Sequence, residues 1–275
     1  LVGSEMCIRD RFVRIPAGFT KTLTQKSITW QFKTEPSENT SNRQIATTQG
    51  RLLGGSGSIN GMIYVRGQPA DYDHWAQLGN HGWGYEDVLN YFSRSENRIG
   101  QDASNVHGRN GGVPITDMDW FNPISEAFIN TAEEYGHIRN PDYNSGVQEG
   151  VGYFQRAINR GLRVSSARGI LRPVQKNRNI KLILNARVTN IIFEDKTAKG
   201  VSFIRKRNGA VTSINAKREV IISAGAANTA RLMQISGLGP GQLLQNLDIK
   251  VTKSLEGVGN NLIDHYGARM VMKAN

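Results

Sequence analysis

The sequence predicts a mixed α/β fold in which a helical region precedes an antiparallel β-meander. Two segments in the first half, residues 83–97 and 122–136, place apolar side chains at helical spacing. From residue 179 the apolar residues recur with a period of two, in three runs separated by turn residues. Neighbouring strands joined by such short turns pair antiparallel, so these patterns together predict both kinds of secondary structure.

The first part of the chain is rich in loops, and residues 12–60 show few periodic segments. The first predicted helix lies in residues 83–97 (WGYEDVLNYFSRSEN), where Val88, Leu89 and Phe92 share one face. A buried apolar stripe of this kind is expected to pack against the rest of the domain.

The second predicted helix, within residues 122–136 (NPISEAFINTAEEYG), has clear boundary signals. Asn122 suits the N-cap, Pro123 suits the first turn, and Gly136 suits the position just after the end. A turn-rich connector, residues 107–115, separates the two helices.

The second half predicts a three-stranded antiparallel meander over residues 179–225, with Asn208-Gly209 as a hairpin turn. Residues 219–226 (EVIISAGA) are expected to form a buried strand that joins a larger sheet. Residues 229–237 (TARLMQISG) predict a helix capped by Asn228 or Thr229 and ended by Gly237. A strand, a small-residue turn and a helix N-terminus in this order form a corner that accepts anions.

Composition describes an ordinary folded protein with a basic balance. The chain has 38% hydrophobic residues and a net charge of +11, from 34 basic and 23 acidic residues. The basic residues are dispersed, which favours a solvated surface or attraction to an anionic cofactor or substrate over nucleic-acid binding. No apolar run approaches the roughly 20 residues that span a bilayer. One cysteine and five histidines without ligand spacing argue against a disulfide framework and a metal site.

The glycine-rich stretch GRLLGGSGSINGMIYVRG (residues 50–67) is the most unusual local feature. Gly55, Gly57 and Gly61 are spaced one residue too widely for the dinucleotide fingerprint. The preceding residues, 41–50, are polar and turn-like rather than a buried strand, and no Gly-Lys-Ser/Thr comes after the glycines. The stretch is therefore not a standard phosphate loop, although glycines allow its backbone to approach a partner closely.

Five motifs in order resemble those of the glucose–methanol–choline (GMC) oxidoreductases, most closely the choline-dehydrogenase-like members. The glycine stretch resembles the first family signature at Gly50, Arg51, Leu53, Gly54, Gly55, Ser56, Ile59 and Asn60, with Gly57 in place of a serine. The other matching segments are residues 64–92, 161–173, 225–240 and 257–265, and Ala230 stands where the family has proline.

The resemblance implies a flavin adenine dinucleotide (FAD) cofactor covered by the glycine stretch. It implies part of an FAD-binding Rossmann-like domain with the meander, and part of a substrate or cap domain. The cofactor-binding residues it implies are Arg51, Gly54, Gly55, Ser56, Asn60, Gly61, Met62, Ile63, Val188, Ala224 and Gly225. For Ser56 and Asn60 the alternative is a role within their own loop, for Met62 and Ile63 core packing, and for Arg51 a solvated surface position.

The resemblance also implies a division of the chain into segments. Residues 12–89 would form the lid and flavin-covering segment, 90–155 a substrate-domain segment, 156–262 the FAD-binding segment, and 263–275 the start of a second substrate segment. Residues 1–11 (LVGSEMCIRDR) share no pattern with the rest of the chain and resemble a translated adapter, so we expect them to be non-native.

By this resemblance the chain is expected to be an internal fragment of an enzyme that transfers hydride from a primary alcohol to flavin N5. The family's histidine base would lie in a C-terminal block that matches nothing here, so no catalytic residue is assigned and the fragment is expected to be inactive. Oxygen or a quinone would accept the electrons, in a cytoplasmic or membrane-peripheral setting. The alternative is a non-enzymatic basic binding module that carries the same loop.

Overall fold

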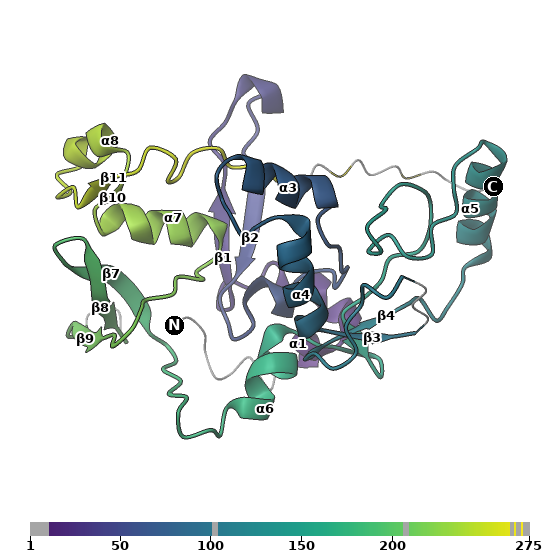
Figure 1. Cartoon of the computed structure of the whole chain (residues 1–275), viewed down its shortest axis with the longest axis horizontal. Helices are drawn as coiled ribbons and strands as arrows, with labels where there is room; N and C mark the ends of the chain where they lie inside the picture. The colour runs from purple at the N-terminus through teal and green to yellow at the C-terminus, as the bar shows by residue number, and fades with distance from the viewer. Residues whose placement is uncertain (1–10, 101–103, 206–208, 265–266, 268–270, 272–275) are drawn as a thin grey trace. The chain divides into compact units, whose positions relative to one another are not determined.

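The computed structural model describes residues 11–100, 104–205, 209–264, 267 and 271. These residues form two compact units, which divide between residues 182 and 183 (Figure 1). Residues 1–10 lie outside the described ranges, so the expectation that the first eleven residues are non-native stays a prediction. The finer segment boundaries also stay predictions.

The first unit begins with short helices and a two-stranded ribbon. Helices α1 (Arg11–Arg14) and α2 (Phe19–Thr22) precede strands β1 (Thr29–Lys33) and β2 (Ala46–Gly50), which pair antiparallel. The prediction of a turn-like stretch before the glycines is therefore wrong, since β2 leads directly into them. Its polar, β-branched residues suit a ribbon that is half exposed, which a search for an apolar run does not detect.

Both predicted helices of this unit are confirmed. Helix α4 (Tyr85–Ser95) comes after α3 (Pro69–Gln77) and buries Val88. Helix α5 (Pro123–Glu134) is capped by Asn122, whose Oδ1 accepts a hydrogen bond of 2.9 Å from the Ile124 amide. Gly136, two residues after the helix, has a φ of 90°, which favours glycine.

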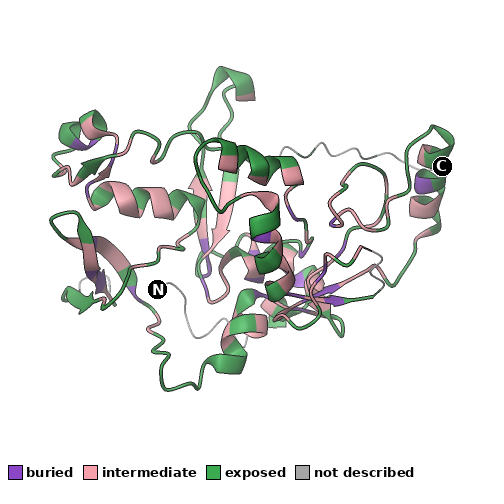
Figure 2. Cartoon of the chain, in the orientation of Figure 1, coloured by how far each residue is buried: buried purple, intermediate pink, exposed green. Residues whose placement is uncertain are grey.

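Short strands hold the centre of the first unit together. Strand β3 (Glu96–Ile99) pairs parallel with β4 (Val113–Thr116), and β5 (Ile158–Asn159) pairs antiparallel with β6 (Leu162–Arg163). Arg156 forms antiparallel bridges to both Ile63 and Thr116, so the chain just after the glycines joins this region. Figure 2 shows buried residues gathered around β3 and β4. A π-helical turn (Ala167–Leu171) and α6 (Arg172–Val174) complete the unit.

The second unit contains the predicted meander. Strands β7 (Arg187–Glu194), β8 (Thr197–Ile204) and β9 (Thr212–Asn215) pair antiparallel in that order, which confirms the prediction. Asn208 of the expected hairpin turn lies outside the described residues.

The prediction of a buried strand over residues 219–226 is wrong, because residues 219–224 are not a strand in the structure. Their side chains alternate between exposed and half-buried, as in a strand, but no described strand pairs with them. Ile221 is 78% exposed. The apolar alternation gives these residues a preference for extended backbone, but strand hydrogen bonds require a neighbour.

The helix after this segment starts earlier than predicted. Helix α7 (Ala226–Ile235) has Gly225 at its N-cap, with a φ of 85°, so Asn228 and Thr229 are not the cap. The two alanines after Gly225 are strong helix formers, which extends the helix toward the strand-like segment. Gly237, with a φ of 87°, lies just after the helix as predicted.

The second unit ends with β10 (Leu238–Gly239), α8 (Gly241–Asn246) and β11 (Lys253–Ser254), and β10 pairs parallel with β11. Within the described ranges of the chain, no helix has the length and apolar character needed to cross a membrane.

Candidate functional site

The glycine stretch folds as a loop whose two ends are anchored in the core. Leu52 and Ile59 are buried and pack with Ile28 at the base of the β1–β2 ribbon. Between them, Gly55–Ser58 form one 3₁₀ turn that starts from Gly54. The Ser58 hydroxyl is buried and donates a 2.8 Å hydrogen bond to the Leu53 carbonyl, which closes the loop on itself.

Four glycines of the stretch, at positions 54, 55, 57 and 61, differ in what surrounds them. A Cβ at Gly54 would lie 2.5 Å from Ser58 Oγ, and the φ of 85° already favours glycine. A Cβ at Gly57 would meet only Ser165 Cβ, at an ordinary 3.8 Å. Positions 55 and 61 open into free space, and of these two only Gly55 has a left-handed φ. Among the described residues, nothing requires glycine at position 61.

The polar side chains of the loop hold its shape. Ser56 Oγ accepts a 3.0 Å hydrogen bond from the Gly50 amide. Asn60 Oδ1 accepts from the Met62 amide at 3.1 Å and from Arg163 Nη1 at 2.7 Å. Both side chains are thus used within the fold, although Ser56 and Asn60 remain exposed on their outer sides.

Met62 and Ile63 lead out of the loop in different environments. Met62 is only 6% exposed and takes a left-handed φ of 64°, which is uncommon for a residue with a side chain and marks a constrained site. Its side chain therefore packs in the core. Ile63 is 48% exposed and is free to meet a ligand.

Arg51, at the start of the loop, has an exposed side chain. Its guanidinium lies over the ring of Trp30, 5.1 Å from the centroid. This cation–π contact keeps the charge at the surface beside the loop.

Arg163, which sequence reasoning did not single out, lies under the loop. It is 2% exposed, and its Nη1 donates to the Gly57 carbonyl at 3.2 Å as well as to Asn60. The sequence contained a signal that could have identified Arg163, because this residue belongs to the family-like segment 161–173. The sequence does not show that this segment packs against the loop, however. Ser165 of the same segment lies against Gly54 and Gly57.

Four charged side chains form a buried network that includes Arg66, shortly after the loop in sequence. Arg66 pairs with Glu96, and His107 Nδ1 lies 3.0 Å from Glu96 Oε1 while its Nε2 lies 2.9 Å from Asp142 Oδ2. Two cations and two carboxylates balance, as buried charges must. Asn144 ties the network to the backbone, since its Oδ1 accepts from the Arg66 amide at 2.7 Å.

The network fixes the protonation of His107. Burial alone would lower the pKa of His107, but the hydrogen bonds to Asp142 and Glu96 and their charges outweigh it and raise the pKa to about 9. Burial would likewise raise the pKa of Asp142, but hydrogen bonds from His107 and Gln155 hold it below its ordinary value of 3.8. With both ring nitrogens donating to carboxylates, His107 is a charged structural group and not a free base.

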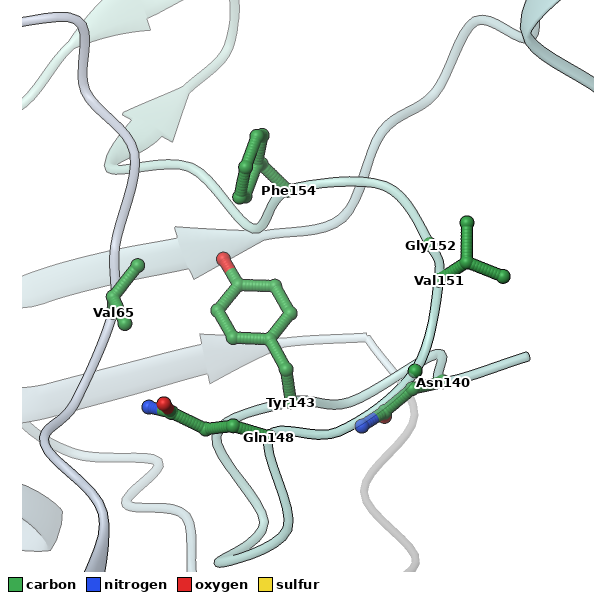
Figure 3. A pocket seen from close by; sticks show the side chains of 8 residues that line it. Val65, Asn140, Tyr143, Gln148, Val151, Gly152 and Phe154 are labelled. Carbon is green, nitrogen blue, oxygen red and sulfur yellow. The ribbon is translucent and has the colours of Figure 1, made fainter. Parts of the chain in front are cut away.

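A cavity of about 340 Å³ opens next to this network (Figure 3). It is lined by Val65, Asn140, Tyr143, Gln148, Gly150, Val151, Gly152 and Phe154. The Tyr143 hydroxyl donates to the Tyr64 carbonyl at 2.7 Å and accepts from the Gln155 amide at 2.8 Å, and burial raises the pKa of Tyr143 to about 12. None of the lining residues is charged, so the cavity offers an apolar and amide surface for binding, without an acid or base.

The remaining predicted residues belong to the second unit. Gly225 lines an open hollow of about 550 Å³ at the start of α7, together with Ser223, Ala226, Thr229, Ala230, Met233, Val258 and Gly259. The amide of Ala224 donates to Thr229 Oγ1 at 3.2 Å. Val188 lies in β7, against which α7 packs. The predicted anion-accepting corner therefore lacks its strand, and an anion site at the start of α7 stays a prediction.

Comparison with known proteins gives the family. The sequence model of the GMC oxidoreductases matches residues 6–267. The chain belongs to the GMC oxidoreductase family. The match extends far beyond the glycine loop, so the resemblance is not confined to that loop.

Two curated relatives show how far the similarity extends. An oxygen-dependent choline dehydrogenase of Rhizobium johnstonii is 39% identical over 92% of this chain and 46% of its own length. An alcohol dehydrogenase [acceptor] of Pseudomonas putida is 36% identical over 96% of this chain and 48% of its own length. The chain thus spans about half the length of these GMC relatives.

Solved structures confirm the GMC fold class. An FAD-dependent oxidoreductase from Chaetomium thermophilum, 31% identical, aligns with a TM-score of 0.83 over 90% of this chain and 44% of its own. A pyridoxine 4-oxidase aligns with a TM-score of 0.81 at 28% identity, over 88% of this chain and 47% of its own. The predicted mixed fold, with helices, small sheets and an antiparallel meander, is therefore confirmed.

Proposed function

We propose that the whole protein is an FAD-dependent oxidoreductase that oxidises a primary alcohol of the choline type. The observation that carries the proposal is the match to the GMC family over residues 6–267, together with a glycine loop that leaves free space at positions 55 and 61. FAD, when bound, accepts at its N5 atom the hydride that leaves the alcohol carbon. Relatives named as choline and alcohol dehydrogenases support this class of substrate.

The residues present fit such a cofactor. Positions 55 and 61 have free space where a Cβ would lie, and Ser56, Asn60 and Ile63 of the same stretch are exposed. We propose that these residues and Gly54 bind the flavin mainly through backbone atoms, with Arg51 near the diphosphate. Met62 contributes through its constrained backbone, since its side chain is buried.

In the second unit we propose Val188, Ala224 and Gly225 as further FAD contacts. The hollow at the start of α7 supports Gly225, because free amides and the helix dipole at a helix N-terminus favour a phosphate. No catalytic residue is assigned within this chain. His107 and Tyr143 do not qualify, because both are held in hydrogen bonds of the fold.

The test is anaerobic mixing of the purified whole protein with choline and with other alcohols. Bleaching of the bound yellow flavin by a primary alcohol, and not by the matching acid, is the expected result. A protein that purifies with full flavin but is bleached by none of these alcohols would contradict the proposed substrate class. Reoxidation by oxygen or by a quinone then identifies the electron acceptor.

A further inference from the structure

Arg163 is a cation that the fold buries without compensating its charge. It lies in β6, and its Nη1 donates only to neutral oxygens, those of Gly57 and Asn60. Its Nε and Nη2 are buried and have no hydrogen-bond partner in the described part of the chain. No carboxylate among the described residues forms an ion pair with it, and burial lowers the pKa of the guanidinium.

A buried, unpaired guanidinium destabilises the folded state unless an opposite charge compensates it. The buried network around Glu96 shows that this fold does compensate charges where it can. An uncompensated arginine directly beneath an open loop therefore indicates that the opposite charge comes from outside the described residues.

Arg168, in the same segment, adds to the positive potential. Its Nη1 is also buried without a partner among the described residues, and its pKa is lowered by burial and by repulsion from Arg14 and Arg172. Arginines that repel one another in this way favour an anionic group nearby.

We propose that Arg163 is a positioning residue for negative charge on the ligand of the glycine loop. Its guanidinium holds Gly57 and Asn60 from the protein side, while its uncompensated charge attracts an anionic group on the open side. The inference rests on the proposed FAD function, and FAD can offer negative charge in its diphosphate or in its reduced ring system.

The test uses the whole protein with Arg163→Gln, Arg163→Lys and the exposed control Arg178→Met. Gln keeps a donor for the loop but loses the charge, whereas Lys keeps the charge. We expect Gln to weaken FAD binding to the apoprotein roughly tenfold, the effect of one charge-assisted hydrogen bond. Lys should retain most of the affinity, and the control should match the wild type.

Two further readouts locate the charge on the ligand. If the negative charge is that of the diphosphate, Arg163→Gln leaves the affinity for riboflavin unchanged, because riboflavin has no diphosphate. If the negative charge is that of the reduced ring, Arg163→Gln makes the flavin reduction potential more negative. The proposal would be overturned if Arg163→Gln and Arg163→Lys changed FAD affinity equally. It would also be overturned if Arg163→Gln changed neither FAD affinity nor the reduction potential, because Arg163 would then be purely structural. A wild-type protein without FAD affinity would instead contradict the proposed function.

Discussion

His107 Nδ1 lies 3.0 Å from Glu96 Oε1, and both side chains are fully buried. The ring also faces Asp142 through Nε2, so the imidazolium links two carboxylates that come from segments far apart in sequence. This network supports the chain at Arg66, which lies shortly after Met62 at the end of the glycine loop.

Stability should therefore depend on pH through His107. Because its pKa is raised from 6.5 to about 9 in the folded state, its contribution is complete below pH 6.5 and is lost as the pH rises through 9. The melting temperature of the chain, measured by circular dichroism from about pH 6 to about pH 10, should fall over that interval.

The variant His107→Gln should lower stability near neutral pH by roughly 3 kcal/mol, because Glu96 and Asp142 lose a shared cation. It should also flatten the decline above pH 6.5. The control His137→Gln removes an exposed histidine and should keep the wild-type profile. A His107→Gln profile as steep as that of the wild type would contradict the role of the network.

Gly54→Ala should destabilise the loop whether or not a cofactor is bound. The new Cβ would lie 2.5 Å from Ser58 Oγ and 2.7 Å from Ser165 Oγ, and the residue would need a left-handed φ. We expect a loss of roughly 1–3 kcal/mol in urea unfolding of the apoprotein. If the apoprotein keeps its wild-type stability, the described loop conformation is not the one in solution.

The chain of 275 residues expressed alone should hold FAD weakly, because its sequence contains no G-x-G-x-x-G loop for the diphosphate. It should also tend to aggregate, since Ile221, Leu262 and Ile263 are 78%, 78% and 89% exposed. Gel filtration with added FAD measures both properties. A monomer that carries stoichiometric yellow flavin would refute this expectation.

The sequence predicts the elements whose signals are local. Helix α4 has an apolar stripe, helix α5 also has boundary signals, and the meander has period-two runs, so all three are found where expected. Strand β2 was missed because a half-exposed ribbon carries little apolar signal. Residues 219–224 show the reverse, since their strand-like pattern finds no described partner.

For the candidate site, the sequence identifies the loop but not what holds it. The resemblance marks Ser56 and Asn60, yet only the structure shows that their oxygens accept hydrogen bonds from Gly50, Met62 and Arg163. Arg163 lies 103 residues from Asn60 along the chain, and no local pattern connects it to the loop.

The central claim is that the open side of the glycine loop lies against flavin, and Gly61→Ala tests it most directly. The described protein leaves free space at position 61 and no left-handed φ, so alanine should be neutral in the apoprotein. Gly57→Ser is the matched control, because that position faces Ser165 at an ordinary distance and serine reduces the freedom of the unfolded chain.

The measurement is the flavin content of the two purified variants of the whole protein, with apoprotein melting temperatures as a check on folding. The account predicts wild-type flavin in Gly57→Ser and a strong loss of flavin in Gly61→Ala at an unchanged apoprotein melting temperature. Full flavin in Gly61→Ala would contradict the account, because the loop would then not contact the cofactor.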